Sequence, residues 1–182
     1  MLPSFLPLNG AKVGSAVKVP PPPNFRPIEG AIRNVGVGAK RFSNHGSSQA
    51  QKSGLRYETR VHAYLSGRFG FNYIEAPVFS FEDDTGRRTC IPDALLKLPS
   101  RIVLIEIKSQ HMPEAWWQLR RLYEPVLRTA AVPTKELVLV EICRSLDIQM
   151  PFPEPFENLD DLLPWAREAE DGSLGVLRWT PR

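Results

Sequence analysis

The feature that most constrains the fold is the segment 102–108, in which four apolar residues precede Glu106, Ile107 and Lys108. An unbroken apolar run of this kind is typical of a strand buried on both faces, at the centre of a sheet. Alternate side chains of a strand share a face, so Glu106 and Lys108 point together. Burying an unpaired charge costs several kcal/mol, and charges at the end of a central strand are therefore more informative than charges in a loop.

A second carboxylate is predicted to join this pair. Asp93 follows Pro92 on the preceding predicted strand, and a turn at 99–100 lets the two strands pair antiparallel. Asp93 and Glu106 each lie six residues from that turn, so the fold-back places them opposite each other. Two convergent carboxylates suit a hard divalent cation, and we expect Mg²⁺ here, with Mn²⁺ as a substitute. Lys108 would orient or help deprotonate an attacking water.

The pattern Glu-x-Lys by itself is also common in ordinary same-face ion pairs. The addition of Pro92-Asp93 at a hairpin-compatible distance, on a buried strand, favours the catalytic interpretation.

The pattern of the remaining chain predicts an α/β (α+β) domain. Helical spacing predicts a first helix over 55–67, and a second helix begins at Pro113 and ends or kinks at Pro125. Strands are expected at 71–81, interrupted near Pro77, at 87–98 and at 137–142, with a hairpin loop at 83–86. The order is helix, three antiparallel strands, helix, strand, which gives a mixed central sheet flanked by helices.

Three regions differ in composition. Residues 1–52 are rich in Pro, Gly, Ser and Asn and carry seven Lys or Arg against Glu29 alone, which predicts an extended basic arm. Such an arm can dock on a protein partner or on phosphates, or it can be a solvated tail. Residues 53–144 form the expected core. Residues 145–182 are expected to pack on its edge, with a short acidic helix over 159–169 and a strand near 174–178.

Pro92-Asp93, twelve intervening residues and then Glu106-Ile107-Lys108 resemble the motif of the PD-(D/E)XK nuclease superfamily. The αβββαβ order from Leu55 to Ile142 is similar to its restriction-endonuclease-like core. The resemblance implies that Asp93 and Glu106 are metal ligands, with the carbonyl of Ile107 as a further ligand and Lys108 positioning water. Glu58 resembles the acidic residue that many members carry on the first helix, although a surface glutamate is an equal interpretation.

The second helix gives a weaker likeness to the RecB-like subgroup. Gln118 stands where those members have a Gln followed by a Tyr, but Tyr123 comes one residue later than in that pattern. The iron–sulfur branch is excluded, because it needs four cysteines and this chain has two. Neither Cys90 nor Cys143 has the spacing of a zinc site or a disulfide framework.

Other residues are candidates for support or substrate contact. His62 lies one turn beyond Glu58 and could approach a metal, or be a surface or capping residue. Arg87 and Arg88 could contact phosphates, or be solvated. An aromatic and basic edge that could stack on bases, or instead pack against the sheet, consists of Trp116, Trp117, Arg120 and Arg121.

The function these observations predict is a metal-dependent deoxyribonuclease acting on DNA through an activated water. The alternatives are a catalytically silent nucleic-acid-binding or assembly adaptor on the same fold, and a dimeric branched-DNA resolvase. The start of the chain lacks the features of a signal peptide, and no stretch approaches the ~20 apolar residues of a membrane span, so we expect a cytoplasmic protein without a membrane.

Overall fold

A computed structural model describes residues 21–38, 49–99, 101–130, 136–144, 166–168 and 175–178, and the structural statements below concern these residues. The first half contains β1 (Arg33–Gly38), α1 (Gln49–Phe69), the 3₁₀ turn η1 (Gly70–Asn72), β2 (Tyr73–Glu75), β3 (Val78–Asp83) and β4 (Gly86–Cys90). The second half contains β5 (Ala94–Lys97), β6 (Arg101–Lys108), α2 (Pro113–Gln118), the π-helical turn η2 (Leu119–Tyr123), α3 (Glu124–Ala130), β7 (Glu136–Cys143), β8 (Ala166–Glu168) and β9 (Gly175–Arg178).

The larger sheet has six strands in the order β2-β5-β6-β7-β9-β8. β6 pairs antiparallel with β5 and parallel with β7, while β7 pairs parallel with β9. The sheet is therefore mixed, and the apolar segment 102–105 lies in an interior strand, as its composition predicted. The strand predicted near 174–178 is confirmed as β9, which lengthens this sheet.

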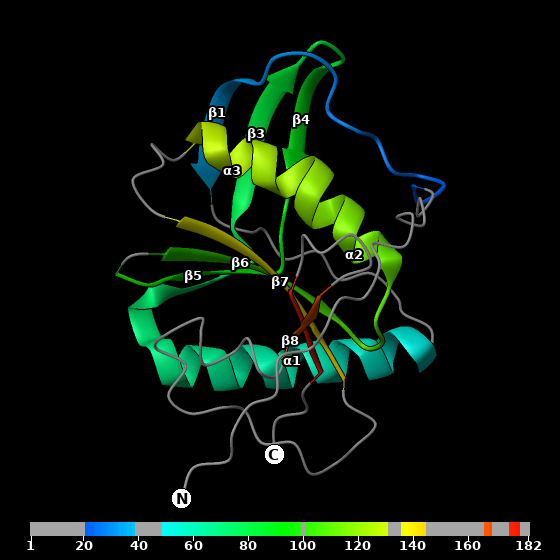
Figure 1. The fold of residues 1–182 in the computed structure, drawn as a ribbon, viewed down its shortest axis with the longest axis vertical. Coiled ribbons are helices and arrows are strands. Elements are labelled where there is room, and N and C mark those ends of the chain that lie inside the picture. Colours follow the sequence, from blue (N-terminus) through cyan, green and yellow to red (C-terminus); the bar gives the residue numbers. More distant parts are fainter. Residues whose placement is uncertain are drawn as a thin grey trace, which may run out of the picture.

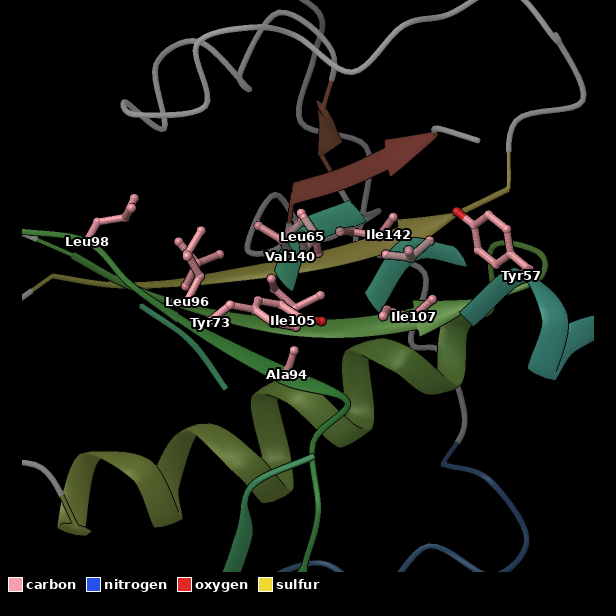
Figure 2. Close-up of a cluster of buried hydrophobic side chains, with 12 residues drawn as sticks. Tyr57, Leu65, Tyr73, Ala94, Leu96, Leu98, Ile105, Ile107, Val140 and Ile142 are labelled. Atoms are coloured by element: carbon pink, nitrogen blue, oxygen red, sulfur yellow. The ribbon is translucent and has the colours of Figure 1, made fainter. Parts of the chain in front are cut away.

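Helices cover both faces of the sheet, with α1 on one side and the continuous α2–η2–α3 helix on the other (Figure 1). The core on the α1 side joins Tyr57, Val61 and Leu65 to the alternating residues Ile105 and Ile107 of β6, and β7 adds Val140 and Ile142. Figure 2 shows this cluster. The opposite core gathers Leu104, Leu119, Tyr123 and Leu139 with residues of β3 and β4. The prediction of a mixed α/β fold is confirmed.

A long strand predicted over 87–98 is wrong, because the chain bends between β4 and β5 at Ile91, Pro92 and Asp93. The preceding strand bends at Ala76-Pro77, as predicted, and the Ala76 N–H donates to the Asp93 carbonyl at 2.8 Å. β3 and β4 thus leave the large sheet and form a second sheet of order β1-β3-β4. A proline supplies no N–H for a continuous ladder, which accounts for both breaks.

Part of the predicted arm is ordered structure. β1 pairs antiparallel with β3, and α1 begins at Gln49, several residues earlier than its predicted start. The buried carboxylate of Asp83 accepts hydrogen bonds from the hydroxyl and N–H of Thr85 and from the N–H of Glu29. These bonds, with that of Arg88, lower the pKa of Asp83 to about 2. Residues 26–38 are held on the β3–β4 hairpin by tertiary contacts. The Gly- and Pro-rich composition of this segment does not predict such contacts.

The second helix does not end at Pro125. The Glu124 N–H bonds to the Leu119 carbonyl, five residues back, and this wide π turn precedes the proline before α3 continues to Ala130. A π turn changes the local hydrogen-bond ladder, so the proline is accommodated without a helix end. At the C-terminal end, Ala166–Glu168 is a strand where a helix was predicted, and the remainder of 159–169 lies outside the described residues.

Candidate metal and phosphodiester site

The paired ends of β5 and β6 bring Asp93, Glu106 and Lys108 together. Ala94, the first residue of β5, pairs with Ile105, so Asp93 lies directly before this register and Glu106 directly after it, which agrees with the predicted fold-back. The Ile107 N–H donates to Asp93 Oδ2 at 2.6 Å, and this hydrogen bond holds the Asp93 carboxylate against the backbone of β6. The N–H and the carbonyl of a strand residue face the same neighbour, so the Ile107 carbonyl points to the same side as Asp93.

Glu106 is the most deeply buried member of the group, with 2% of its surface exposed. Its Oε1 accepts a hydrogen bond from Lys108 Nζ at 2.5 Å. Its Oε2 has no partner of hydrogen-bonding geometry among the described residues, although the backbone N–H of Asp93 lies close enough to the carboxylate to lower its pKa. Buried carboxylate oxygens are almost always satisfied, so this orphaned oxygen indicates a ligand that completes the site.

Burial is the largest cause of the pKa shifts of the two carboxyls, Asp93 and Glu106. Burial, followed by the charge of Asp93, raises the pKa of Glu106 to about 8, although Lys108 opposes the shift. Burial likewise raises the pKa of Asp93. For Lys108, burial lowers the pKa but the carboxylate of Glu106 outweighs it, and the net direction is upward. The ammonium therefore keeps its proton, while the two carboxyls resist carrying two negative charges together.

This charge state predicts how stability depends on pH. The folded-state pKa of Glu106 is raised, so between about pH 4.5 and about pH 8 the folded protein holds a proton that the unfolded chain releases. The free energy of unfolding then falls as pH rises through this window, by up to about 1.4 kcal/mol per pH unit. In the presence of EDTA, Glu106→Gln should show a shallower decline than the wild type in urea denaturation, because only the raised pKa of Asp93 and of Glu141 still contributes, whereas the exposed control Glu136→Gln should retain the full decline. Parallel curves for Glu106→Gln and the wild type would contradict the assignment.

Two further candidate residues, Glu58 and His62, lie on α1. His62 Nε2 is 3.5 Å from Glu58 Oε1, and His62 Nδ1 is 2.5 Å from the hydroxyl of Tyr73. Both ring nitrogens thus have partners, which favours a supporting role for His62 over metal ligation. Glu58 raises and His62 lowers the pKa of Asp93, so both act on the site electrostatically.

The second helix contributes Gln118 and Tyr123 from the opposite face. Gln118 Oε1 is buried and has no hydrogen-bond partner among the described residues. Tyr123 is buried, and its pKa is raised by burial first and then by the charges of Glu106 and Asp93. The hydroxyl of Tyr123 therefore belongs to the electrostatic surroundings of the carboxylate pair.

The hairpin arginines are not part of this group. Arg88 donates to the carbonyls of Arg26 and Pro27 at 2.6 and 2.7 Å and to Asp83 at 2.8 Å. Its guanidinium therefore attaches residues 26–29 to the hairpin. Arg87 is exposed and pairs in register with Glu82 on β3.

The aromatic edge of the second helix is also largely structural. Trp116 packs against the second core and carries the guanidinium of Arg121 over its ring at 5.3 Å. Trp117 meets Phe25 edge-on, with ring centroids 5.5 Å apart. Arg120 bonds to Glu124 at 2.6 Å.

The donor set fits a cation that keeps much of its hydration. Within the described ranges, no group of three or more His, Cys, Asp or Glu side chains is gathered closely enough to hold a metal ion. The protein would supply Asp93, Glu106 Oε2 and the Ile107 carbonyl, and Mg²⁺ commonly accepts one or two carboxylates with several waters.

Comparison of the chain with protein-family models, curated proteins and solved structures found no match. In the part of the chain that the structure describes, no helix is long and apolar enough to cross a membrane.

Sequence reasoning missed two residues beside this site, His111 and Glu141. Glu141 is the register neighbour of Glu106 on β7 and is fully buried. Its signal was available, since it is the single charge within the apolar segment 137–142. His111, in the loop after β6, gave no sequence signal because its partner is thirty residues away.

Proposed function

We propose that the protein is a Mg²⁺-dependent nuclease that hydrolyses DNA phosphodiester bonds, built on a restriction-endonuclease-like core. The observation that carries this proposal is the state of the buried Glu106 carboxylate beside Asp93. One of its oxygens accepts a hydrogen bond from Lys108, and the other has no partner among the described residues. A structural ion pair would not need an orphaned oxygen beside a second, partly buried carboxyl.

Each residue of the candidate site has a separate role in this proposal. Asp93 and Glu106 would hold the cation, and Mg²⁺ bound there would acidify water and offset charge on the phosphate. Lys108, fixed by Glu106, places an ammonium beside the carboxylates, where it can orient the attacking water and offset negative charge on the phosphate. The water oxygen forms a bond to phosphorus as the bond to the leaving oxygen breaks. The water's proton passes to solvent, and the leaving oxygen gains a proton.

The π turn supports the likeness of the second helix to RecB-like nucleases. Tyr123 follows Gln118 by five residues, one more than in that pattern. The π turn between them covers five residues, and its hydrogen bond joins residues five apart. One more residue than in an α-helical turn therefore fits into this single turn. Gln118 and Tyr123 can then line the same site from the helix.

The proposal is tested with purified wild-type protein on linear, circular, single-stranded and branched DNA, in Mg²⁺ or in EDTA. We expect hydrolysis of at least one form in Mg²⁺, retained in Mn²⁺ and abolished by EDTA. No cleavage of any form, or equal cleavage in EDTA, would refute it. The adaptor and dimeric-resolvase alternatives stay predictions, because no contact of the described residues favours either.

A further inference from the structure

A further buried carboxylate, that of Glu141, lies directly beside Glu106. Glu141 on β7 is in register with Glu106 on β6, and neighbouring residues of a parallel pair point to the same face. Glu141 Oε1 accepts the Met112 N–H at 3.0 Å, and Oε2 lies 2.8 Å from His111 Nδ1. Both oxygens of this fully buried side chain are therefore used to hold the loop that follows β6.

This contact fixes the His111 ring. The ionised carboxylate of Glu141 can only accept, so Nδ1 carries the proton in this bond and Nε2 is the ring nitrogen that Glu141 does not engage. The side chain of His111 is 32% exposed, and the ring has no second polar partner among the described residues. Glu141 also acts electrostatically on Lys108, so the imidazole and the ammonium belong to the same end of the sheet.

We propose that His111 is the proton donor to the leaving oxygen and that Glu141 is its positioning residue. This inference rests on the proposed nuclease function and adds the acid that it requires. The acting form of His111 is the imidazolium, which has a proton on each ring nitrogen. As the phosphorus–oxygen bond breaks, its electron pair goes to the leaving oxygen, which takes the proton from Nε2. Neutral His111 keeps its Nδ1–H on Glu141 and regains a proton from solvent, so one water is consumed for each bond cut.

The test compares two DNA duplexes that differ at a single scissile linkage. One has normal phosphodiester chemistry, and in the other a sulfur replaces the leaving oxygen, at the 3′ or 5′ side given by the ends that the wild type produces. A thiolate leaves without protonation, so it does not need the acid. Single-turnover rates are measured for the wild type, His111→Gln and the neighbouring exposed control Gln110→Ala, with urea denaturation to verify folding.

His111→Gln should cleave the normal linkage about 10²–10⁴-fold more slowly than the wild type and the sulfur linkage at close to the wild-type rate. Glu141→Gln should show a smaller loss of the same selective kind. An equal loss on both linkages, or no loss on either, would overturn the assignment of His111 while leaving the nuclease intact. Failure of the wild type to cleave normal DNA would instead overturn the proposed function, and this inference with it.

Discussion

Asp93→Asn is expected to reduce DNA hydrolysis by about 10³-fold or more while leaving the protein folded. The amide keeps the size of the side chain, and its oxygen can still accept the Ile107 N–H that now bonds Oδ2. What is lost is one of two negative charges that would bind the cation. Several kcal/mol of transition-state stabilisation depend on such a cation, and each 1.36 kcal/mol is a factor of ten in rate.

The stability of this variant separates catalysis from folding. Burial raises the pKa of Asp93, so a neutral side chain costs the folded protein little. Glu136→Gln is the matched control, because Glu136 is an exposed carboxylate paired with Arg101 where β6 and β7 begin. A folded Asp93→Asn protein that cuts DNA as fast as Glu136→Gln would show that Asp93 is not a ligand.

Lys108→Met should reduce the single-turnover rate of DNA cleavage by about 10²–10³-fold, as the loss of a preorganised electrostatic group does. Methionine retains much of the aliphatic length but removes the ammonium that lies 2.5 Å from Glu106. Without that ammonium, Glu106 becomes a buried carboxyl with no cationic partner, and its pKa should rise further. Raising Mg²⁺ should recover only the part of the rate that is lost through the higher pKa of Glu106, because the cation competes with that proton, and the part lost with the ammonium itself should remain.

The matched control is Lys97→Met, which removes an exposed ammonium from β5. It should cleave DNA at the wild-type rate. If Lys108→Met also keeps that rate, Lys108 serves only to neutralise Glu106.

The arrangement of the candidate site could be predicted because its signals are local in sequence. The apolar segment 102–105 identifies an interior strand, and a short turn fixes the register that sets Asp93 against Glu106. Period-two alternation then places Lys108 on the same face as Glu106. These steps need only strand geometry, and the structure agrees with each of them.

The remainder depended on tertiary contacts. The pairing of β1 with β3 and the attachment of residues 26–29 by Arg88 join segments that are forty or more residues apart. The apolar spacing of the second helix does not distinguish a π turn from an α-helical turn, so the π turn before Pro125 was not predicted. The contact of His111 with Glu141 spans the second helix and most of β7, so sequence spacing alone did not reveal it.

The measurement that tests the central claim most directly is the rate of DNA hydrolysis by the wild type and Glu106→Gln as Mg²⁺ is raised from zero. Both proteins are first shown to be folded by urea denaturation. We predict a saturable rise for the wild type and a flat, near-zero response for Glu106→Gln, because the amide cannot supply the charged oxygen that has no partner among the described residues. Superimposable Mg²⁺ curves for the two proteins would contradict the account.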